Sequence, residues 1–323
     1  MAALNEFDVI QTFFHRAAPE GYVGVGDDCA LFSVRPGYQL AVSTDTLIEG
    51  QHFFSDVDPY DLGHKSLAVN LSDLCAMGAE PKGCVLALAL PQVDPQWLQA
   101  FSSGLHALAA QSNCPLIGGD TTRHPYAVTI TLTIFGEVPI TQALRRDLAR
   151  AGDDIWITGT LGAADLALRY LTQRLPMDAE RLEQTRSALE RPLPPYAFAP
   201  HLLGHAHAAI DISDGFLQDL SHILTASHCG AQVSWADLPM HPALRGVAPE
   251  LQQAAVLAGG DVFELCFTAP PTERAYLLDL AAQHQIRLTR IGTVVPESGL
   301  VVVDASGHAL NLPAQGGFDH FSA

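Results

Sequence analysis

The sequence predicts a protein built from two α/β domains. Its 323 residues are 48% hydrophobic, which is enough apolar material for a sizeable core and a length typical of about two domains. Strand and helix patterns follow one another in two successive series, with a break near residue 145. We therefore expect an N-terminal domain over residues 1–145 and a C-terminal α/β domain over residues 146–323.

The first series contains three predicted strands and two predicted helices. The clearest strand runs from Ala127 to Val138, where Val, Ile and Leu alternate with Thr, so one face should be buried and the other polar. Gln39 to Thr44 and Gly83 to Leu90 are richer in apolar residues and are expected to be strands with deeper burial. Helices are predicted from Pro59 to Met77 and from Pro95 to Ser112, because each follows an Asp that can cap it and starts with Pro.

The second series has a similar character. A helix is predicted from Leu161 to Gln173 and another from Phe216 to Ala226, and Leu193-Pro194-Pro195 marks a connection. Short apolar runs predict the strands of this half, which are Asp154 to Thr158, Ala209 to Ile212, Phe263 to Thr268, Arg287 to Val295 and Leu300 to Val303.

Charge and composition exclude several classes of function. The formal net charge is −18 with only 17 Lys and Arg, so a basic face for nucleic acid is not expected. An acidic chain can still bind a polyanion if divalent metal lies between them. No signal peptide and no run of about 18 apolar residues is present, and none of the six cysteines forms a C-x-x-C pair. We expect a reduced, cytoplasmic protein with no membrane association, whose cysteines are small core residues.

The most informative feature is a set of aspartates that follow or interrupt apolar segments. Four of the five motifs have Ser or Thr beside the acid, and hard oxygen donors of this kind suit magnesium. The motifs are Gly26-Asp27-Asp28, Ser43-Thr44-Asp45-Thr46, Asn70-Leu71-Ser72-Asp73, Gly118-Gly119-Asp120-Thr121 and Asp211-Ile212-Ser213-Asp214-Gly215.

Each motif taken alone is better explained by turn and helix-cap chemistry. Taken together they support a site with several metal ions as strongly as turn chemistry, since neighbouring carboxylates repel one another unless cations neutralise them. Asn70 and Asp73 are three residues apart within a predicted helix, so they share one face. From the residues alone, a multi-metal site and ordinary turn chemistry both stay open.

Motifs for other nucleotide and acyl chemistries are missing. The chain has no G-x-x-x-x-G-K-[ST] loop, no fitting G-x-G-x-x-G, no protein-kinase motif pair and no G-x-S-x-G elbow. Phosphate would thus be bound through metal. His201, His205 and His207 cluster in sequence, and an exposed helix end explains them better than a metal site. His52 differs, because it lies in a loop beside the Asp45 strand.

These segments resemble the thiamine-monophosphate kinase family over nearly the whole chain. The matching segments are GDDCA (Gly26 to Ala30), STDTLIEGQHF (Ser43 to Phe53), DLGHKSLAVNLSDLCAMGAEP (Asp61 to Pro81), LIGGDTTR (Leu116 to Arg123), DISDGFLQDL (Asp211 to Leu220) and GFDHF (Gly317 to Phe321). The resemblance implies an α/β fold of the α+β type shared with aminoimidazole ribonucleotide synthetase. It also implies a homodimer whose N-terminal sheets close into a barrel, with nucleotide bound through magnesium.

The resemblance also implies a role for individual residues. Magnesium ligands would be Asp28, Ser43, Thr44, Asp45, Asp73, Asp120, Asp211 and Asp214. Of these, Asp73, Asp45 and Asp120 would be central to catalysis, and Asp120 would also contact ATP, as would Gly119, Arg146 and Ser213. Thiamine monophosphate, the implied acceptor, would contact His52, Asp261 and Phe318.

Two departures from the family pattern stand out. Asp261 is followed by Val262 where the family commonly has a second acid, and the segment Arg145 to Asp154 departs from the usual R-S-G-A-x-P-G-D. The implied reaction is direct in-line transfer from ATP to a phosphate oxygen, with several magnesium ions neutralising both polyanions.

Three alternatives remain at this point. They are another enzyme of the same superfamily, a metal-dependent phosphohydrolase, and a non-catalytic module that binds nucleotide or metal. Selenophosphate synthetase is disfavoured among the superfamily members, because residues Glu20 to Asp28 contain neither Cys nor Lys.

Overall fold

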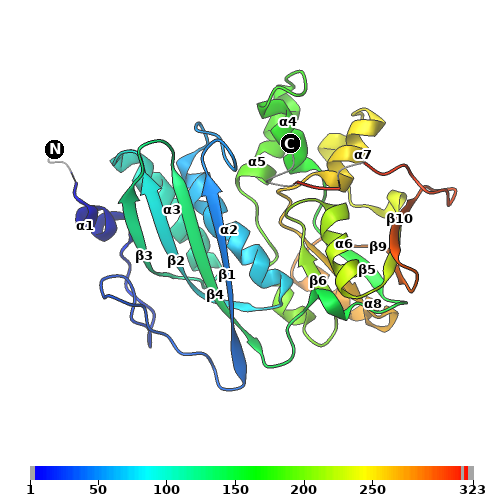
Figure 1. The fold of residues 1–323 in the computed structure, drawn as a ribbon, viewed down its shortest axis with the longest axis horizontal. Coiled ribbons are helices and arrows are strands. Elements are labelled where there is room, and N and C mark those ends of the chain that lie inside the picture. Colours follow the sequence, from blue (N-terminus) through cyan, green and yellow to red (C-terminus); the bar gives the residue numbers. More distant parts are fainter. Residues whose placement is uncertain (1–3, 314–315, 319–323) are drawn as a thin grey trace. The chain divides into compact units, whose positions relative to one another are not determined.

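The chain forms two compact units, which a computed structural model describes over residues 4–313 and 316–318 (Figure 1). The first unit comprises Met1–Leu74 and Ala79–Thr141, and the second comprises Cys75–Gly78 and Gln142–Ala323. The described helices all lack the combination of length and apolar character that crossing a bilayer would demand.

The first unit is a four-stranded mixed sheet with two long helices against one face (Figure 1). The strand order is β1-β4-β2-β3, in which β2 and β3 run parallel and the other neighbours antiparallel. The elements are α1 (Glu6–Val9), the π-helical turn η1 (Ile10–Phe14), β1 (Tyr38–Ile48), α2 (Pro59–Ala76), β2 (Glu80–Leu90), α3 (Pro95–Gln111), β3 (Leu116–Arg123) and β4 (Thr129–Pro139).

Both predicted helix starts are confirmed. The carboxylate of Asp94 accepts hydrogen bonds from the backbone N–H groups of Gln96 and Trp97, and Asp58 accepts one from Tyr60. These bonds satisfy amides that the first helical turn leaves without intrahelical partners. The alternation predicted for β4 is also confirmed, since Ile130, Leu132 and Ile134 are buried.

Two glycines let α2 and α3 approach each other closely. A Cβ atom added to Gly63 would lie 1.9 Å from the carbonyl oxygen of Phe101 on α3. A Cβ atom on Gly104 would lie 1.9 Å from the carbonyl oxygen of Tyr60 on α2. Real side chains cannot occupy such space, so the helix pair needs glycine at both positions.

Strand β1 differs from the sequence prediction in length and in burial. It extends past Thr44 to Ile48, so that Asp45 lies inside the strand and not at its end. It is an edge strand, and Leu40 and Val42 are 46% and 55% exposed. The expected deep burial was wrong here, because apolar content alone does not reveal whether a strand has neighbours on both sides.

The second unit is a six-stranded mixed sheet of order β10-β7-β9-β5-β8-β6, in which only the β10–β7 pair is parallel among the described strands. Its strands are β5 (Asp154–Thr158), β6 (Ala208–Asp211), β7 (Gly230–Ser234), β8 (Leu265–Ala269), β9 (Leu288–Val295) and β10 (Gly299–Val303). Its helices are α4 (Ala163–Leu171), α5 (Ala179–Glu190), α6 (Phe216–Ala226), α7 (Pro249–Ala258) and α8 (Arg274–Gln283), with 3-10 turns η2 (Arg146–Leu148), η3 (Ala199–Leu202), η4 (Trp235–Asp237), η5 (Pro242–Leu244) and η6 (Pro271–Glu273).

Both faces of the second sheet are covered. On β5, Ile155 and Ile157 belong to one buried apolar cluster and Trp156 to another. All five residues of this strand are therefore buried, as expected for a strand between two layers. Asp154 lies at the end of β5 with 1% of its side chain exposed, and it is bonded to the guanidinium groups of Arg274 and Arg290 at 2.5 to 2.8 Å.

Several elements were not predicted from the sequence, namely α5, α7, α8, β3 and β7. The predicted helix Leu161 to Gln173 is shorter in the structure, because α4 begins at Ala163 after the left-handed Gly162. Five of the six cysteines are buried as expected, whereas Cys29 is exposed. The core assignment was therefore wrong for Cys29.

Candidate active site

Two acids of the first unit come together across β1 and α2. Ser43 and Asp45 face the helix-covered side of the sheet, because their partners on β4 are the buried Ile134 and Leu132. Ser43 Oγ donates a 2.5 Å hydrogen bond to Oδ2 of Asp73 on α2. The predicted association of Ser43, Asp45 and Asp73 is thus present within this unit.

Desolvation and a like charge both act on this pair. Burial, followed by the charge of Asp73 and a hydrogen bond with it, raises the pKa of Asp45 to about 7. Two carboxylates in this position cannot both be ionised at low cost unless a cation is bound. The pair therefore has the electrostatics of a cation site.

Asn70 adds an uncommitted oxygen one helical turn away. Its side chain is fully buried, and Nδ2 donates to the carbonyl oxygen of Ser66 at 3.2 Å. Among the described residues, Oδ1 of Asn70 has no hydrogen-bond partner. The donors gathered here are all oxygens, which is the chemistry that magnesium prefers, so these residues fit the metal implied by the family.

Asp120 of the same sheet does not lie on the face of this pair. Within residues 4–313 and 316–318, no three His, Cys, Asp or Glu side chains are grouped so that they could hold a metal ion. Asp120 lies inside β3 opposite Ala87, on the face of the sheet away from Asp45. Thr44 points to that same face, and its hydroxyl is 2.6 Å from Thr133 Oγ1. Asp120 and Thr44 therefore do not share the face of Asp45 and Asp73, and the role of Asp120 as a magnesium ligand stays a prediction.

The backbone conformation at position 119, next to Asp120, requires glycine. Its φ is +156°, and an added Cβ atom would lie 2.0 Å from the carbonyl oxygen of Leu86. The residues from Gly118 to Thr121 line a cavity together with Ile10, Phe14 and Val25. A peptide with no side chain next to a cavity can bring its N–H groups close to a ligand.

Asp28 and His52 lie in loops of the first unit. Asp28 is exposed, and its N–H donates to Asp27 Oδ1 at 3.0 Å. His52 follows β1, and its Nδ1 accepts the backbone N–H of Ile48 at 3.0 Å. A neutral imidazole that accepts at Nδ1 carries its proton on Nε2, so His52 presents an N–H group suited to an anion.

In the second unit, the last residue of β6 and the loop after it contain three of the predicted site residues. Asp211 is the buried last residue of β6, and Ser213 and Asp214 are partly exposed. Asp219 on α6 supports the loop, because its Oδ2 accepts the N–H groups of Asp214 at 3.2 Å and of Gly215 at 3.0 Å. Desolvation, opposed by these amide bonds and reinforced by the charge of Asp214, raises the pKa of Asp219 to about 7.

A second loop lies against the first and has an unusual backbone. Asp261 and Phe263 have positive φ values of +56° and +54°. The N–H of Asp261 donates to the carbonyl oxygen of Ser213 at 2.8 Å. Val262, which replaces the usual second acid, packs against the core of the unit. Left-handed backbone at two non-glycine residues costs energy and is typical of functional loops.

Phe318 is connected to the same region by a residue that sequence reasoning missed. Gln218 Nε2 donates to Asp214 Oδ2 at 3.1 Å and to the carbonyl oxygen of Phe318 at 3.0 Å. The N–H of Phe318 in turn donates to the carbonyl oxygen of Asp214 at 3.0 Å. Gln218 lies in the first turn of α6, four residues after Asp214 in the sequence, and this short spacing was a signal that could have revealed it.

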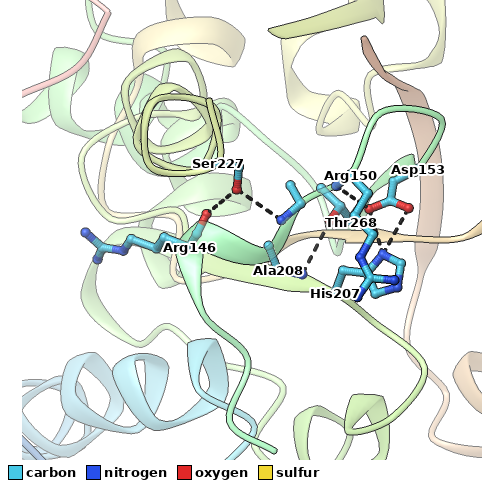
Figure 2. Close-up of polar contacts among 8 residues, drawn as sticks. Arg146, Arg150, Asp153, His207, Ala208, Ser227 and Thr268 are labelled. Carbon is cyan, nitrogen blue, oxygen red and sulfur yellow. Dashed lines mark hydrogen bonds and ion pairs between the residues drawn. The ribbon is translucent and has the colours of Figure 1, made fainter. Parts of the chain in front are cut away.

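Figure 2 shows how the turn carrying Arg146 is held. Ser227 Oγ, at the end of α6, donates to the carbonyl oxygen of Arg146 at 2.7 Å and accepts the N–H of Ala149 at 3.0 Å. Arg145 forms an ion pair with Asp147. The Arg146 guanidinium makes no hydrogen bond or ion pair with the described residues. Of the two neighbouring arginines, Arg146 is thus the one whose guanidinium can bind an anion.

The clustered histidines have separate partners. His207 contacts Asp153 at 2.8 Å (Figure 2), and His205 contacts Glu273 at 2.7 Å while stacking on Tyr276. His201 lies instead near His284, with a ring separation of 4.8 Å. The expected exposed helix end holds only for His201, because His205 and His207 lie beyond the 3-10 turn and are partly buried.

The two halves of the chain match two known domain families. Residues 26–138 match AIR synthase related protein, N-terminal domain, and residues 150–305 match AIR synthase related protein, C-terminal domain. Together with the two mixed sheets described above, these matches define a two-domain AIR synthase-like α/β protein.

Full-length relatives make the assignment narrower. The chain is 43% identical to thiamine-monophosphate kinase of Escherichia coli (strain K12) over 326 residues, which covers 99% of both chains. The crystal structure of thiamine-monophosphate kinase from Stenotrophomonas maltophilia K279a matches with a TM-score of 0.83 and 44% identity, covering 90% of this chain and 93% of that one. AaThiL complexed with AMPPCP and TMP matches with a TM-score of 0.75 and 26% identity, covering 90% and 89%. The chain belongs to the thiamine-monophosphate kinase family and is therefore a kinase.

Proposed function

We propose that the protein transfers the terminal phosphoryl group of ATP to thiamine monophosphate and so produces thiamine diphosphate. The observation that carries this proposal is the 43% identity to the Escherichia coli enzyme over 99% of both chains. The complex of the relative AaThiL with AMPPCP and TMP supports the same pair of ligands. The all-oxygen donor set at Asp45 and Asp73 supports a requirement for magnesium.

We assign magnesium binding to the residues that the family pattern marks. In the first unit these are Asp28, Ser43, Thr44, Asp45, Asp73 and Asp120, and in the second Asp211 and Asp214. When bound, magnesium would neutralise phosphate charge on both substrates. Asp73 is central to the first set, because it bonds Ser43 and interacts with Asp45. Thr44 faces away from Asp73, so its side chain would serve a different cation or none.

The chain's own cationic and N–H groups are assigned to the substrates. Arg146 would bind an ATP phosphate oxygen through its guanidinium, and Ser213 and Gly119 would contact ATP from their loops. His52 would donate its Nε2 proton to the acceptor phosphate. Asp261 and the half-exposed ring of Phe318 would contact the thiamine portion.

The acceptor itself explains why no general base is needed. A phosphate oxygen is already ionised near neutral pH, whereas a hydroxyl acceptor requires a base to remove its proton. The described acids of the first unit are better used on metal, and His52 accepts a hydrogen bond at Nδ1 and so offers a donor at Nε2. The residues therefore match an acceptor that brings its own negative oxygen.

The decisive experiment compares two acceptors. Purified protein with ATP and magnesium is given thiamine monophosphate or free thiamine, and thiamine diphosphate and phosphate release are measured directly. We expect thiamine diphosphate from the monophosphate, almost no phosphorylation of thiamine, and no turnover without magnesium. Release of phosphate without a thiamine product would instead identify a phosphohydrolase.

A variant of His52 tests its role in the same assay. His52→Ala should raise KM for thiamine monophosphate far more than it lowers kcat, because it removes a binding contact and not a proton acceptor. A normal KM with collapsed kcat would contradict this assignment and indicate base-assisted chemistry.

We also propose that the protein is a homodimer in which the first sheet pairs with its copy to form a barrel. The apolar face of β4 does not motivate this, since Ile130, Leu132 and Ile134 are buried within the chain. The support lies in β1, an edge strand with exposed Leu40 and Val42. Light scattering at micromolar concentration should give twice the chain mass, and a monomer would contradict the barrel.

A further inference from the structure

Asn70 is a buried polar residue for which the protein supplies only half of the expected hydrogen bonds. Its side chain is completely shielded from solvent, and its Nδ2 is bonded to the carbonyl oxygen of Ser66. Its Oδ1 has no partner among the described residues. A buried acceptor without a partner lowers the free energy of unfolding by about 1–3 kcal/mol. An oxygen left in this state therefore indicates a ligand that binds there.

The packing of α2 on the sheet shows where this oxygen lies. Leu74 packs on Gly136, whose partner on β1 is Ala41, while Asp73 bonds to Ser43. Residues earlier in α2 therefore lie beside residues later in β1.

The next step in this direction reaches Asn70 and Asp45. Asn70 is three residues before Asp73, about 4.5 Å along the helix axis and on the same face. Asp45 is two residues after Ser43, about 6.6 Å along the strand and on the same side of it. Because Nδ2 is bonded to the Ser66 carbonyl on the preceding turn, the planar amide turns Oδ1 away from Ser66, and it does so on the helix face that Asn70 shares with Asp73.

We propose that Asn70 Oδ1 is a further oxygen ligand, direct or through one water, of a divalent cation held by Asp45 and Asp73. This inference rests on the proposed magnesium-dependent function. A neutral amide oxygen completes a magnesium shell without adding a third negative charge to two acids that already repel each other. A cation satisfies the carboxylates and the orphan oxygen at once.

Magnesium binding to the full-length protein, freed of metal by chelation, tests the proposal without any catalysis. Magnesium chloride alone is titrated into the protein by calorimetry, and thermal unfolding is recorded with and without the metal. Asn70→Leu has the same number of side-chain heavy atoms and the same branching but no oxygen, whereas Asn70→Asp keeps an oxygen. Ser66→Ala is the matched control, because its hydroxyl is buried on the same helix and bonded to the Leu62 carbonyl.

We expect Asn70→Leu to weaken magnesium binding about tenfold or more, the scale seen when a group supporting a metal is lost. Its melting temperature without metal should be unchanged or higher, because an unsatisfied acceptor is gone. Asn70→Asp should retain magnesium binding, melt at a lower temperature without metal, and show a larger rise on adding it. Ser66→Ala should bind magnesium as the wild type does.

Wild-type magnesium affinity in Asn70→Leu would overturn the proposal. If Asn70→Leu does not fold, a wild-type magnesium affinity in Asn70→Ala overturns it equally. Asp73→Asn separates this result from a failure of the proposed function. If Asp73→Asn abolishes magnesium binding while Asn70→Leu does not, the inference about Asn70 alone is wrong. If neither change alters binding, the assignment of magnesium to Asp45 and Asp73 is wrong as well.

Discussion

Asp73→Asn should stabilise the metal-free protein while abolishing its activity. The substitution keeps an oxygen that can accept the Ser43 hydrogen bond, and it removes the charge that acts on Asp45. With Asp73 present, the pKa of Asp45 is raised from 3.8 to about 7, first by desolvation and then by Asp73. A shift of about three units corresponds to about 4 kcal/mol. Because desolvation is the larger cause, we assign about 1–2 kcal/mol to Asp73.

The pH dependence follows from the direction of this shift. Unfolded Asp45 loses its proton near pH 4 and folded Asp45 near pH 7, so the metal-free protein loses stability as pH rises between these values. At pH 5 the folded carboxyl is largely protonated, and the variant should match the wild type closely. At pH 8 the variant should be more stable by about 1–2 kcal/mol, or several degrees in melting temperature.

Thermal unfolding in a chelator at pH 5 and pH 8 measures this difference. Asp56→Asn serves as control, because it removes an exposed acid from the same unit and the same charge from the whole chain. An Asp73→Asn protein that is equal to the control or less stable than the wild type at pH 8 would refute the repulsion. With magnesium, ATP and thiamine monophosphate present, the same variant should show no turnover.

Three further predictions concern packing, charge and the arginine turn. Gly104→Ala places a methyl group against the Tyr60 carbonyl and should cost about 3 kcal/mol or more of unfolding free energy, whereas the neighbouring Ser103→Ala should cost under 0.5 kcal/mol by urea denaturation. Asp154→Asn should cost about 2 kcal/mol at pH 7, less than a fully buried pair because both arginines reach solvent. Desolvation raises the pKa of Asp154, but the hydrogen bonds and charges of the two arginines outweigh it, so the pKa lies below its ordinary value. The difference in unfolding free energy between wild type and variant should therefore shrink in unfolding curves as pH falls below about 4. Ser227→Ala should raise KM for ATP more than it lowers kcat in steady-state assays, because it loosens the 3-10 turn that carries Arg146. An unchanged KM would show that the two Ser227 hydrogen bonds do not support ATP binding.

The sequence predicted the elements whose local signals agree with their final environment. β4 alternates between Ile or Leu and Thr, and it lies in the middle of a sheet covered on one side. The helix starts at Asp58 and Asp94 depend on hydrogen bonds within three residues. Such features need no knowledge of distant parts of the chain.

Features that depend on tertiary context could not be predicted. Deep burial was predicted for both β1 and β2, but β1 is at an edge and β2 has two neighbours. β3 was missed because Gly118 and Gly119 have low strand propensity, and it forms through pairing with β2.

For the site, spacing placed Asn70 and Asp73 on one face correctly. Strand alternation also separates Thr44 from Ser43 and Asp45, and that consequence was available from the sequence. Opposite faces for Asp45 and Asp120 depend on the register of four strands, which local sequence does not determine.

The segment Cys75–Gly78 has a consequence for any attempt to divide the protein. Cys75 and Ala76, at the end of α2, belong to the apolar core that contains Leu144, Phe198 and Leu202. A fragment beginning at residue 142 would lack these side chains and would carry a hole where they pack. During synthesis the core of the second unit must also incorporate residues made long before the rest of it. Dissection experiments therefore need a circularly permuted or co-expressed chain rather than a simple cut at the boundary.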